Sequence, residues 1–217
     1  MPAPGSGSVG AVTSVVCFDL GGVFLDWDPR YLYREMFAGD DAAMEHFLAE
    51  VCPPQWHSEM DRGRSIAEAC AERKALFPAS ARFIDAWRER AEDMVRGLVP
   101  GMVEIFAELR ERGTQCFALS NMERENWDLR LSRYDFLGWF DGYFISGYEG
   151  VVKPEPEYFL RAVQKLGFDP AQALFVDDRP ENVEAAAVVG MPAVVFTGAV
   201  SLRQELAARR LLPPAPH

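Results

Sequence analysis

The chain has 217 residues, 49% of them apolar, so one large domain or one domain with an insertion can bury a substantial core. Its 33 acidic and 22 basic residues give a net charge of −11, which argues against nucleic acid and anionic membrane surfaces as partners. No apolar run reaches membrane-spanning length. An anionic substrate would therefore have to be attracted by a local feature, such as a metal ion or a single lysine.

The ends and the cysteines carry little chemistry. We expect residues 1–12 to form a disordered tail, because they are mostly small and uncharged and do not resemble a signal peptide. We expect the proline-rich residues 213–217 to form a frayed tail. The four cysteines lack metal-site spacing, so buried free thiols in a reducing cytoplasm are expected. We expect a monomer or a homodimer.

The first predicted element is a buried strand at residues 15–18. It is followed by Asp19 and by the glycine pair Gly21 and Gly22, which allow a sharp turn and a close approach of a ligand to the backbone. Residues 30–96 then show apolar side chains at helical spacing without a convincing strand. This stretch predicts a helical insertion whose last helix runs over residues 81–95.

Strands and helices alternate regularly after residue 100. The pattern predicts strands at 115–119, 142–145, 173–176 and 193–196 and helices at 100–112, 155–166, 181–189 and 201–210. Such alternation indicates an α/β fold, a Rossmann-like parallel sheet with helices on both faces, which carries an inserted all-helical cap. The expected division is a core of residues 13–28 and 97–212 and a cap of residues 29–96.

Polar side chains stand at the ends of three predicted strands. Asp19 follows the first strand, Ser120 and Asn121 the second, and Asp177 with Asp178 the fourth. Ligands of parallel sheets bind at the carboxyl ends of the strands, so these residues predict one active site.

The residue types at this edge favour phosphoryl chemistry. Clustered carboxylates repel one another unless a cation neutralises them, which predicts Mg²⁺ or a similar hard ion. Lys153, placed just before a helix, and the hydroxyl of Ser120 can hold phosphoryl oxygens. An aspartate at the metal, such as Asp19, can attack phosphorus and form an aspartyl-phosphate that water hydrolyses.

Four ordered motifs carry a family resemblance. They are Phe-Asp-Leu-Gly-Gly-Val at 18–23, Leu-Ser-Asn at 119–121, Val-Lys-Pro at 152–154 and Phe-Val-Asp-Asp-Arg-Pro-Glu-Asn at 175–182. With these motifs the chain resembles the haloacid dehalogenase-like (HAD) hydrolase superfamily over residues 14–206. The helical stretch is similar to the cap that this family inserts after its first strand.

The resemblance implies a role for each matching residue. It makes Asp19 the nucleophile and a metal ligand, and Lys153 the group that neutralises charge on nucleophile and phosphate. The implied remaining roles are metal binding by the Gly21 carbonyl, Asp178 and Asp177, and phosphate binding by Ser120, Asn121 and the backbone at Gly21 and Gly22.

One position departs from the usual pattern of the family's phosphatases. They carry a second aspartate two residues after the nucleophile, which acts as general acid and base, whereas this chain has Gly21. Loss of such a group costs about a hundredfold to ten-thousandfold in rate. The chain also resembles bacterial glucose-1-phosphatases, which have glycine here. Asp26 and Asp28 are candidate substitutes, although an aspartate-rich turn is more often exposed.

The predicted cap offers candidates for substrate selection. Trp56, Asp61 and Arg62 are candidates for shaping the substrate entrance, with packing and turn formation as the alternatives. His57 is interpreted as structural or exposed, because a lone histidine usually is.

The leading hypothesis is therefore a Mg²⁺-dependent phosphatase acting on a small phosphorylated metabolite, with a sugar phosphate as the first candidate. Two alternatives stay open. A 2-haloacid dehalogenase would also lack the second aspartate but would not need the acidic pair. A non-catalytic binding or scaffold member of the family would be permitted by Gly21.

Overall fold

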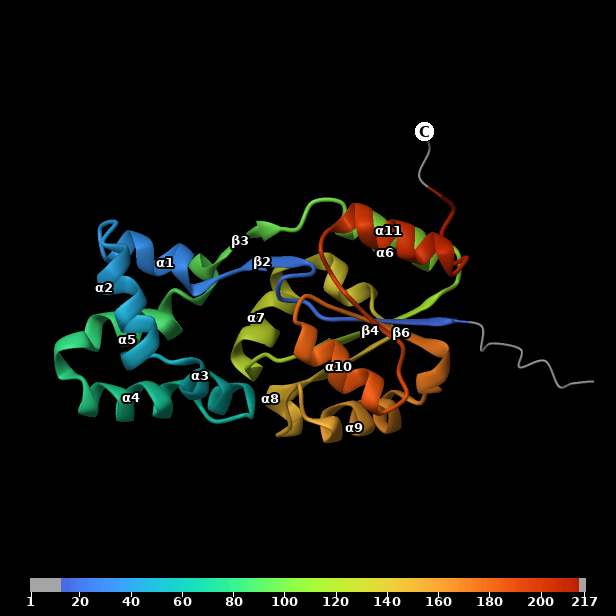
Figure 1. Cartoon of the computed structure of the whole chain (residues 1–217). Coiled ribbons are helices and arrows are strands. Elements are labelled where there is room, and N and C mark those ends of the chain that lie inside the picture. The colour runs from blue at the N-terminus through green and yellow to red at the C-terminus, as the bar shows by residue number, and fades with distance from the viewer. Residues whose placement is uncertain (1–12, 215–217) are drawn as a thin grey trace, which may run out of the picture.

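A computed structural model describes residues 13–214 of the chain, so the tail expected at 1–12 and the last three residues of the tail expected at 213–217 lie outside the described residues. Its centre is a five-stranded parallel sheet of order β5-β4-β1-β6-β7 (Figure 1). The strands of this sheet are β1 Val15–Phe18, β4 Gln115–Ser120, β5 Gly142–Ile145, β6 Ala173–Asp177 and β7 Ala193–Val195. The parallel α/β architecture predicted from the sequence is confirmed.

The first strand lies in the middle of the sheet and is buried on both faces. β1 pairs with β4 on one side and with β6 on the other. Val16 and Phe18 face one hydrophobic cluster, whereas Val15 and Cys17 face another, as the two-residue period of a strand requires. An apolar run without alternation is thus the sequence pattern of a strand covered on both sides.

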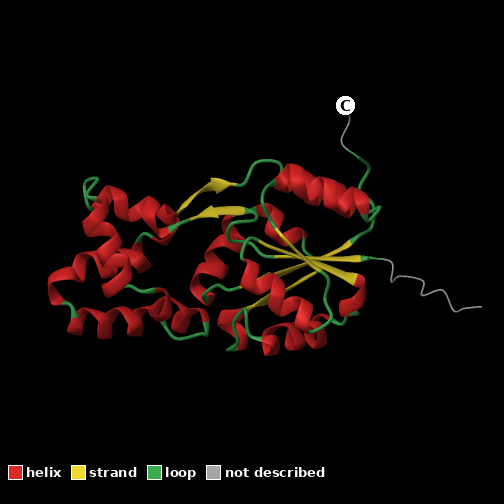
Figure 2. Cartoon of the chain, viewed as in Figure 1, coloured by secondary structure: helices red, strands yellow, loops and turns green. Residues whose placement is uncertain are grey.

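Helices cover both faces of the sheet (Figure 2). The cluster around Phe18 includes side chains of α6 and α11, and the cluster around Cys17 includes side chains of α9 and α10. The helices of this part are α6 Met102–Glu111, α7 Arg124–Arg133, α8 Ser146–Glu149, α9 Pro156–Leu166, α10 Pro180–Val188 and α11 Ala199–Ala208.

The residues between the first two strands of the sheet form a helical segment that lies to one side of it (Figure 1). This segment has a hydrophobic cluster of its own, centred on aromatic side chains such as Tyr33, Phe47 and Trp87. Its helices are α1 Pro29–Met36, α2 Asp41–His46, α3 Pro54–Asp61, α4 Ile66–Leu76 and α5 Ala81–Glu89, with a π-helical turn at Phe47–Val51.

The two chain connections to the helical segment pair as a small antiparallel sheet, which the sequence interpretation missed. β2 Leu25–Trp27 pairs with β3 Val95–Leu98. The predicted helix at 81–95 is therefore too long: α5 ends at Glu89 and a 3₁₀ turn at Ala91–Met94 leads into β3. A three- or four-residue strand is stabilised by its distant partner, and helical periodicity gives no sign of that pairing. The expected boundary between residues 96 and 97 divides this strand.

Two further features match what the sequence indicates. All four cysteines are free and buried, as expected. Among the helices of residues 13–214, none combines the length and the apolar character needed to cross a membrane.

Candidate active site

Asp19 lies just beyond the end of β1, at the carboxyl edge of the sheet. Its backbone N–H donates to the carbonyl of Val176 at 2.9 Å, and the N–H of Leu20 donates to its Oδ1 at 2.7 Å. Its residue exposure is only 8%. Burial raises the pKa of Asp19 to about 7, against the opposing effect of Lys153 and with a further rise from the acidic pair. Asp19 is thus a buried carboxylate whose charged form needs a cationic partner.

Lys153 supplies part of that positive charge. Its buried Nζ lies 3.0 Å from Asp19 Oδ1 and 2.6 Å from Asp177 Oδ2, and it also donates to the carbonyl of Leu119 at 2.9 Å. Burial disfavours the ammonium form, but the two carboxylates raise the pKa of Lys153 overall. Asn121 fixes the backbone, because its amide both donates to the Lys153 carbonyl and accepts from the Lys153 N–H.

The two aspartates after β6 differ in what they contact. Asp177 is fully buried, and its oxygens accept hydrogen bonds from Lys153, from the N–H of Arg179 and from the amide of Asn182. Asp178 is exposed, and its carboxylate lies over Gly22 so closely that an added Cβ there would collide with it. Gly22 also has a φ of +71°, so both space and backbone conformation require glycine.

The donor set of this edge fits a hard cation. Asp19, Asp177 and Asp178 bring one oxygen each to within 4.8 Å of one another. Within residues 13–214, Lys153 is the one cationic side chain that forms ion pairs with this group, and it pairs with Asp19 and Asp177. In addition, the buried Oδ1 of Asn182 has no hydrogen-bond partner among the described residues. Excess negative charge and an orphaned oxygen are the chemistry that Mg²⁺ or a similar ion satisfies. We call Asp19, Lys153, Asp177 and Asp178 the strand-end cluster.

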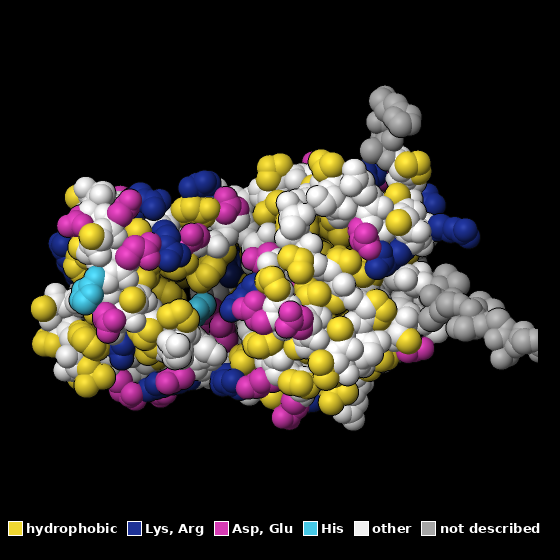
Figure 3. Space-filling view, viewed as in Figure 1, with side chains coloured by type: hydrophobic (Ala, Val, Ile, Leu, Met, Phe, Trp, Pro, Cys, Tyr) yellow, Lys and Arg dark blue, Asp and Glu magenta, His cyan; other side chains and the backbone are white. Residues whose placement is uncertain are grey.

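A cavity of about 350 Å³ opens between the sheet and the helical segment, and Figure 3 shows the hollow between these two parts. The sheet side contributes the strand-end residues Asp19, Lys153 and Asp178. The remaining lining residues are Gly21, Gly22, Trp27, Asp28, Pro29, Arg30, His57, Asp61, Asn121, Arg179 and Asn182. The structure thus brings together the nucleophile candidate, the lysine, the exposed aspartate and both glycines, while Ser120 is buried at the end of β4 outside this lining.

The three cap candidates have different surroundings. Asp61 borders the cavity. Trp56 instead packs in the core of the helical segment, edge-on to Trp87, and its Nε1 donates to the carbonyl of Ala69 at 3.4 Å. Arg62 forms an ion pair with Glu155 and does not line the cavity. Trp56 and Arg62 are not among the residues that line this cavity, and a role for them at the substrate entrance stays a prediction.

The two candidate substitutes for the missing acid are already engaged. Asp28 borders the cavity, but its Oδ1 caps α1 by accepting from the N–H of Arg30 at 2.9 Å and also pairs with the Arg30 guanidinium. Asp26 accepts from the hydroxyl of Tyr31 at 2.6 Å and lies outside the cavity lining. Helix capping and side-chain pairing thus account for both aspartates.

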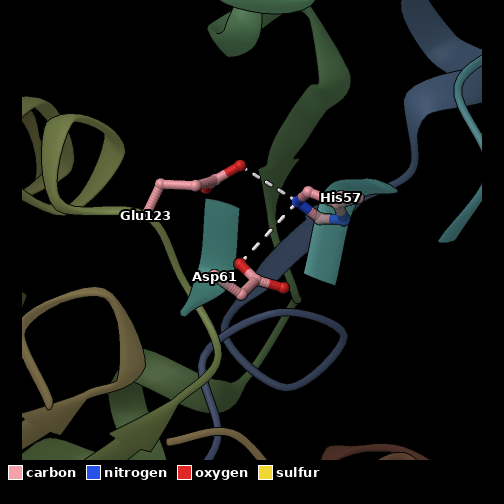
Figure 4. A group of neighbouring side chains, drawn as sticks. All are labelled: His57, Asp61 and Glu123. Carbon is pink, nitrogen blue, oxygen red and sulfur yellow. Dashed lines mark hydrogen bonds and ion pairs between the residues drawn. The ribbon is translucent and has the colours of Figure 1, made fainter. Parts of the chain in front are cut away.

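A second charged group, which the sequence interpretation missed, lies where the helical segment meets the sheet part. His57 Nε2 is 3.0 Å from Glu123 Oε1 and 3.8 Å from Asp61 Oδ1 (Figure 4). We call these three residues the boundary cluster. His57 also stacks on Trp27, with ring centroids 5.5 Å apart. Both acids are buried, at 7% exposure for Asp61 and 3% for Glu123.

The three boundary residues shift one another's protonation. Burial alone would lower the pKa of His57, but Asp61 and Glu123 raise it to about 9. Burial would raise the pKa of Glu123, yet His57 holds it down at about 2. For Asp61 burial prevails and raises the pKa to about 6, although His57 opposes it. The cluster therefore contains an ion pair and a carboxyl group that can carry a proton near neutral pH.

Comparison with known proteins places the chain in a family. The model of the haloacid dehalogenase-like hydrolases matches residues 13–190, so the chain belongs to this family of hydrolases. A sesquiterpene phosphatase of Aspergillus oryzae is 26% identical over 193 residues, covering 87% of this chain and 92% of its own.

Solved structures share the fold. A predicted HAD-like hydrolase from Porphyromonas gingivalis has a TM-score of 0.70 at 22% identity, covering 94% of this chain and 100% of its own. A HAD family enzyme from Bacteroides thetaiotaomicron, solved with magnesium and inorganic phosphate, has a TM-score of 0.65 at 21% identity, covering 86% of this chain and 95% of its own.

Proposed function

We propose that the protein is a Mg²⁺-dependent phosphatase that hydrolyses a small phosphorylated metabolite through an aspartyl-phosphate on Asp19, with a sugar phosphate as the first candidate. One observation carries the proposal. The buried Asp19 carboxylate borders a cavity, 3.0 Å from a buried lysine and beside two further aspartates. The phosphatase name of the relative and the magnesium and phosphate of the structural neighbour point in the same direction.

The residues of the chain divide the work of the reaction. Asp19 attacks phosphorus, so that a bond from its carboxylate oxygen to phosphorus forms as the bond to the leaving oxygen breaks. Lys153 holds Asp19 in place and offsets charge on the phosphoryl group. Water then attacks phosphorus and frees Asp19. Mg²⁺, held by Asp19, Asp178 and the Gly21 carbonyl with Asp177 in support, would polarise the phosphoryl oxygens and offset the remaining charge.

The cavity is consistent with a small polar substrate. Beyond the strand-end cluster its wall carries the cationic side chains of Arg30 and Arg179 together with the indole of Trp27. The four buried free thiols fit the reducing cytoplasm that we propose as the site of action.

The acidic pair argues against the dehalogenase alternative. Attack on carbon by Asp19 would need no cation, whereas Asp177 and Asp178 concentrate negative charge that only one lysine offsets. A test for chloride release from chloroacetate in EDTA separates the two reactions.

The test of the proposal is phosphate release from a panel of sugar phosphates and p-nitrophenyl phosphate, with Mg²⁺ and with EDTA. We expect release that EDTA abolishes and that Asp19→Asn lowers by about a thousandfold or more, as for loss of a nucleophile. Asp41→Asn is the matched control, because this aspartate is exposed in the helical segment. Metal-independent release, or release unchanged in Asp19→Asn, would overturn the proposal. Phosphate binding without turnover would favour a non-catalytic protein.

A further inference from the structure

The reaction proposed above needs a proton donor that the strand-end cluster does not supply. The leaving oxygen must take up a proton as its bond to phosphorus breaks, and the attacking water must lose one. Lys153 already contacts two carboxylates and a backbone carbonyl. Asp177 already accepts hydrogen bonds from three donors. Position 21 has no side chain. A Cβ added there would meet no atom within 4 Å, so the backbone at Gly21 opens directly on empty space.

That space is bordered by the boundary cluster. The cavity of about 350 Å³ that Gly21 lines is also lined by Asp61 and His57, opposite Asp19 and Lys153. An adjoining cavity of about 60 Å³ also has Gly21 and His57 in its wall. Two residues of α3, His57 and Asp61, therefore line the same cavity that a side chain at position 21 would enter.

Within the cluster, Asp61 is the residue with a free oxygen. Its buried Oδ1 accepts no hydrogen bond from the described residues, since the 3.8 Å to His57 Nε2 is too long for one. His57 Nε2 faces Glu123 Oε1 at 3.0 Å (Figure 4). The side-chain amide of Asn126 donates to the other Glu123 oxygen at 2.9 Å. A buried carboxyl oxygen without a hydrogen-bond partner lowers the stability of the fold. Beside a cavity, a bound ligand or a proton on the carboxyl group can satisfy this oxygen.

We propose that Asp61 is the general acid and base of the reaction: it gives its proton to the leaving oxygen, and it then takes a proton from the water that attacks phosphorylated Asp19. The cycle returns Asp61 to its protonated form, and no other reactant is needed. His57 and Glu123 are positioning residues, which hold a positive charge next to Asp61. This inference rests on the proposed phosphatase function.

The electrostatic surroundings of Asp61 suit this role. Burial raises the pKa of Asp61 to about 6, while the nearby cations His57, Lys153 and Arg130 oppose the rise and Glu123 adds to it. A carboxyl group of this kind holds a proton in slightly acidic solution and can accept one near neutrality, as a catalyst that must do both requires.

The discriminating experiment compares two aryl phosphates of similar shape, phenyl phosphate and p-nitrophenyl phosphate. Phenolate is a poor leaving group that needs a proton, whereas p-nitrophenolate leaves without one, and neither phenyl ring offers a hydroxyl group for Asp61 to bind. We expect Asp61→Asn to lower kcat/KM about a hundredfold or more for phenyl phosphate and about tenfold or less for p-nitrophenyl phosphate. Glu59→Gln, an exposed acid-to-amide change on the same helix, is the control and should affect neither.

Two further readouts separate catalysis from structure. Adding Gly21→Asp to Asp61→Asn places a carboxylate in the open space at position 21, and we expect it to restore turnover of phenyl phosphate, whereas Gly21→Asn should not. In the wild type, the ratio of kcat/KM for phenyl phosphate to kcat/KM for p-nitrophenyl phosphate should fall as the pH rises through about 6, because Asp61 loses the proton it donates, whereas ionisation of Asp19 affects both substrates alike. His57→Gln removes a neighbouring positive charge and should move this fall to higher pH.

The outcomes are distinct. An equal loss on both substrates in Asp61→Asn, or no loss, overturns the assignment of Asp61 and leaves the phosphatase function standing. Absence of Mg²⁺-dependent turnover in the wild-type protein, on these substrates and on the sugar phosphates, overturns the phosphatase function and the role of Asp61 with it.

Discussion

The strand-end cluster and the boundary cluster border the same cavity, but they are held in place in different ways. Asp19 and Asp177 adjoin neighbouring parallel strands, and hydrogen bonds of the sheet fix their backbones. His57 and Asp61 come from one helix of the helical segment, whereas Glu123 follows β4 on the other side of the boundary. The first cluster therefore stays intact as long as the sheet does. The second also depends on how the helical segment sits against the sheet.

The balance of charge also differs between the clusters. In the strand-end cluster three carboxylates face one lysine, which leaves an excess of negative charge for a cation. In the boundary cluster one histidine faces two carboxylates, and the carboxyl group of Asp61 can relieve the excess by holding a proton. This difference supports the proposals that the strand-end cluster binds a metal ion and phosphate and that the boundary cluster transfers a proton.

The largest effect is expected from removal of the buried lysine. Lys153→Met leaves Asp19 and Asp177 without their cation, and breaking a buried ion pair in this way costs about 3–5 kcal/mol in the free energy of unfolding. Urea denaturation in EDTA measures the loss. Lys165→Met is the control, because Lys165 is half-exposed. A loss no larger than in the control would show that Lys153 does not hold the strand-end cluster together.

The next effect concerns the boundary cluster and its dependence on pH. The pKa of His57 is raised to about 9 from 6.5, so its stabilising contribution is present below the unfolded value and is lost as the pH rises through about 9. The shift corresponds to about 3 kcal/mol. We expect the free energy of unfolding to fall between neutral pH and pH ~10 in the wild type. His57→Gln should lack this part of the fall, and an equal fall in both proteins would contradict the account.

The smallest effect is expected at the exposed contact between the two parts. The Nη2 atom of Arg62 lies 2.5 Å from Glu155 Oε1, but the two side chains are 42% and 40% exposed. Arg62→Gln should therefore change the free energy of unfolding by less than about 1 kcal/mol. Its kcat/KM should stay within a few-fold of the wild type, since Arg62 does not line the cavity. A larger loss of kcat/KM would show that Arg62 contributes to the substrate entrance.

The sequence predicted the sheet and the strand-end residues because both leave local patterns. Apolar runs that stop at Asp19, at Ser120 and at Asp177 mark strands whose carboxyl ends meet, and parallel topology places those ends at one edge. The order of the two acids could not be obtained this way. The structure separates them by their contacts, since Asp177 is buried and fully hydrogen-bonded while Asp178 lines the cavity.

The boundary cluster could not be predicted because its members are far apart in the sequence. His57 and Glu123 are 66 positions apart, and they meet only once the helical segment is placed against the sheet. The one local signal was the four-residue spacing of His57 and Asp61, which puts both on the same face of a helix. The pairing of β2 with β3 was hidden for the same reason.

The central claim is that Asp19 is phosphorylated during turnover, and rapid acid quenching followed by mass spectrometry of the Asp19 peptide tests it directly. We predict a phosphoryl adduct on this peptide in the wild type with Mg²⁺ and p-nitrophenyl phosphate. Asp61→Asn should show more of it, because p-nitrophenolate leaves without a proton whereas the attacking water loses its base. Asp19→Asn should show none. Phosphate release by the wild type without any adduct, or an adduct on another residue, would contradict the account.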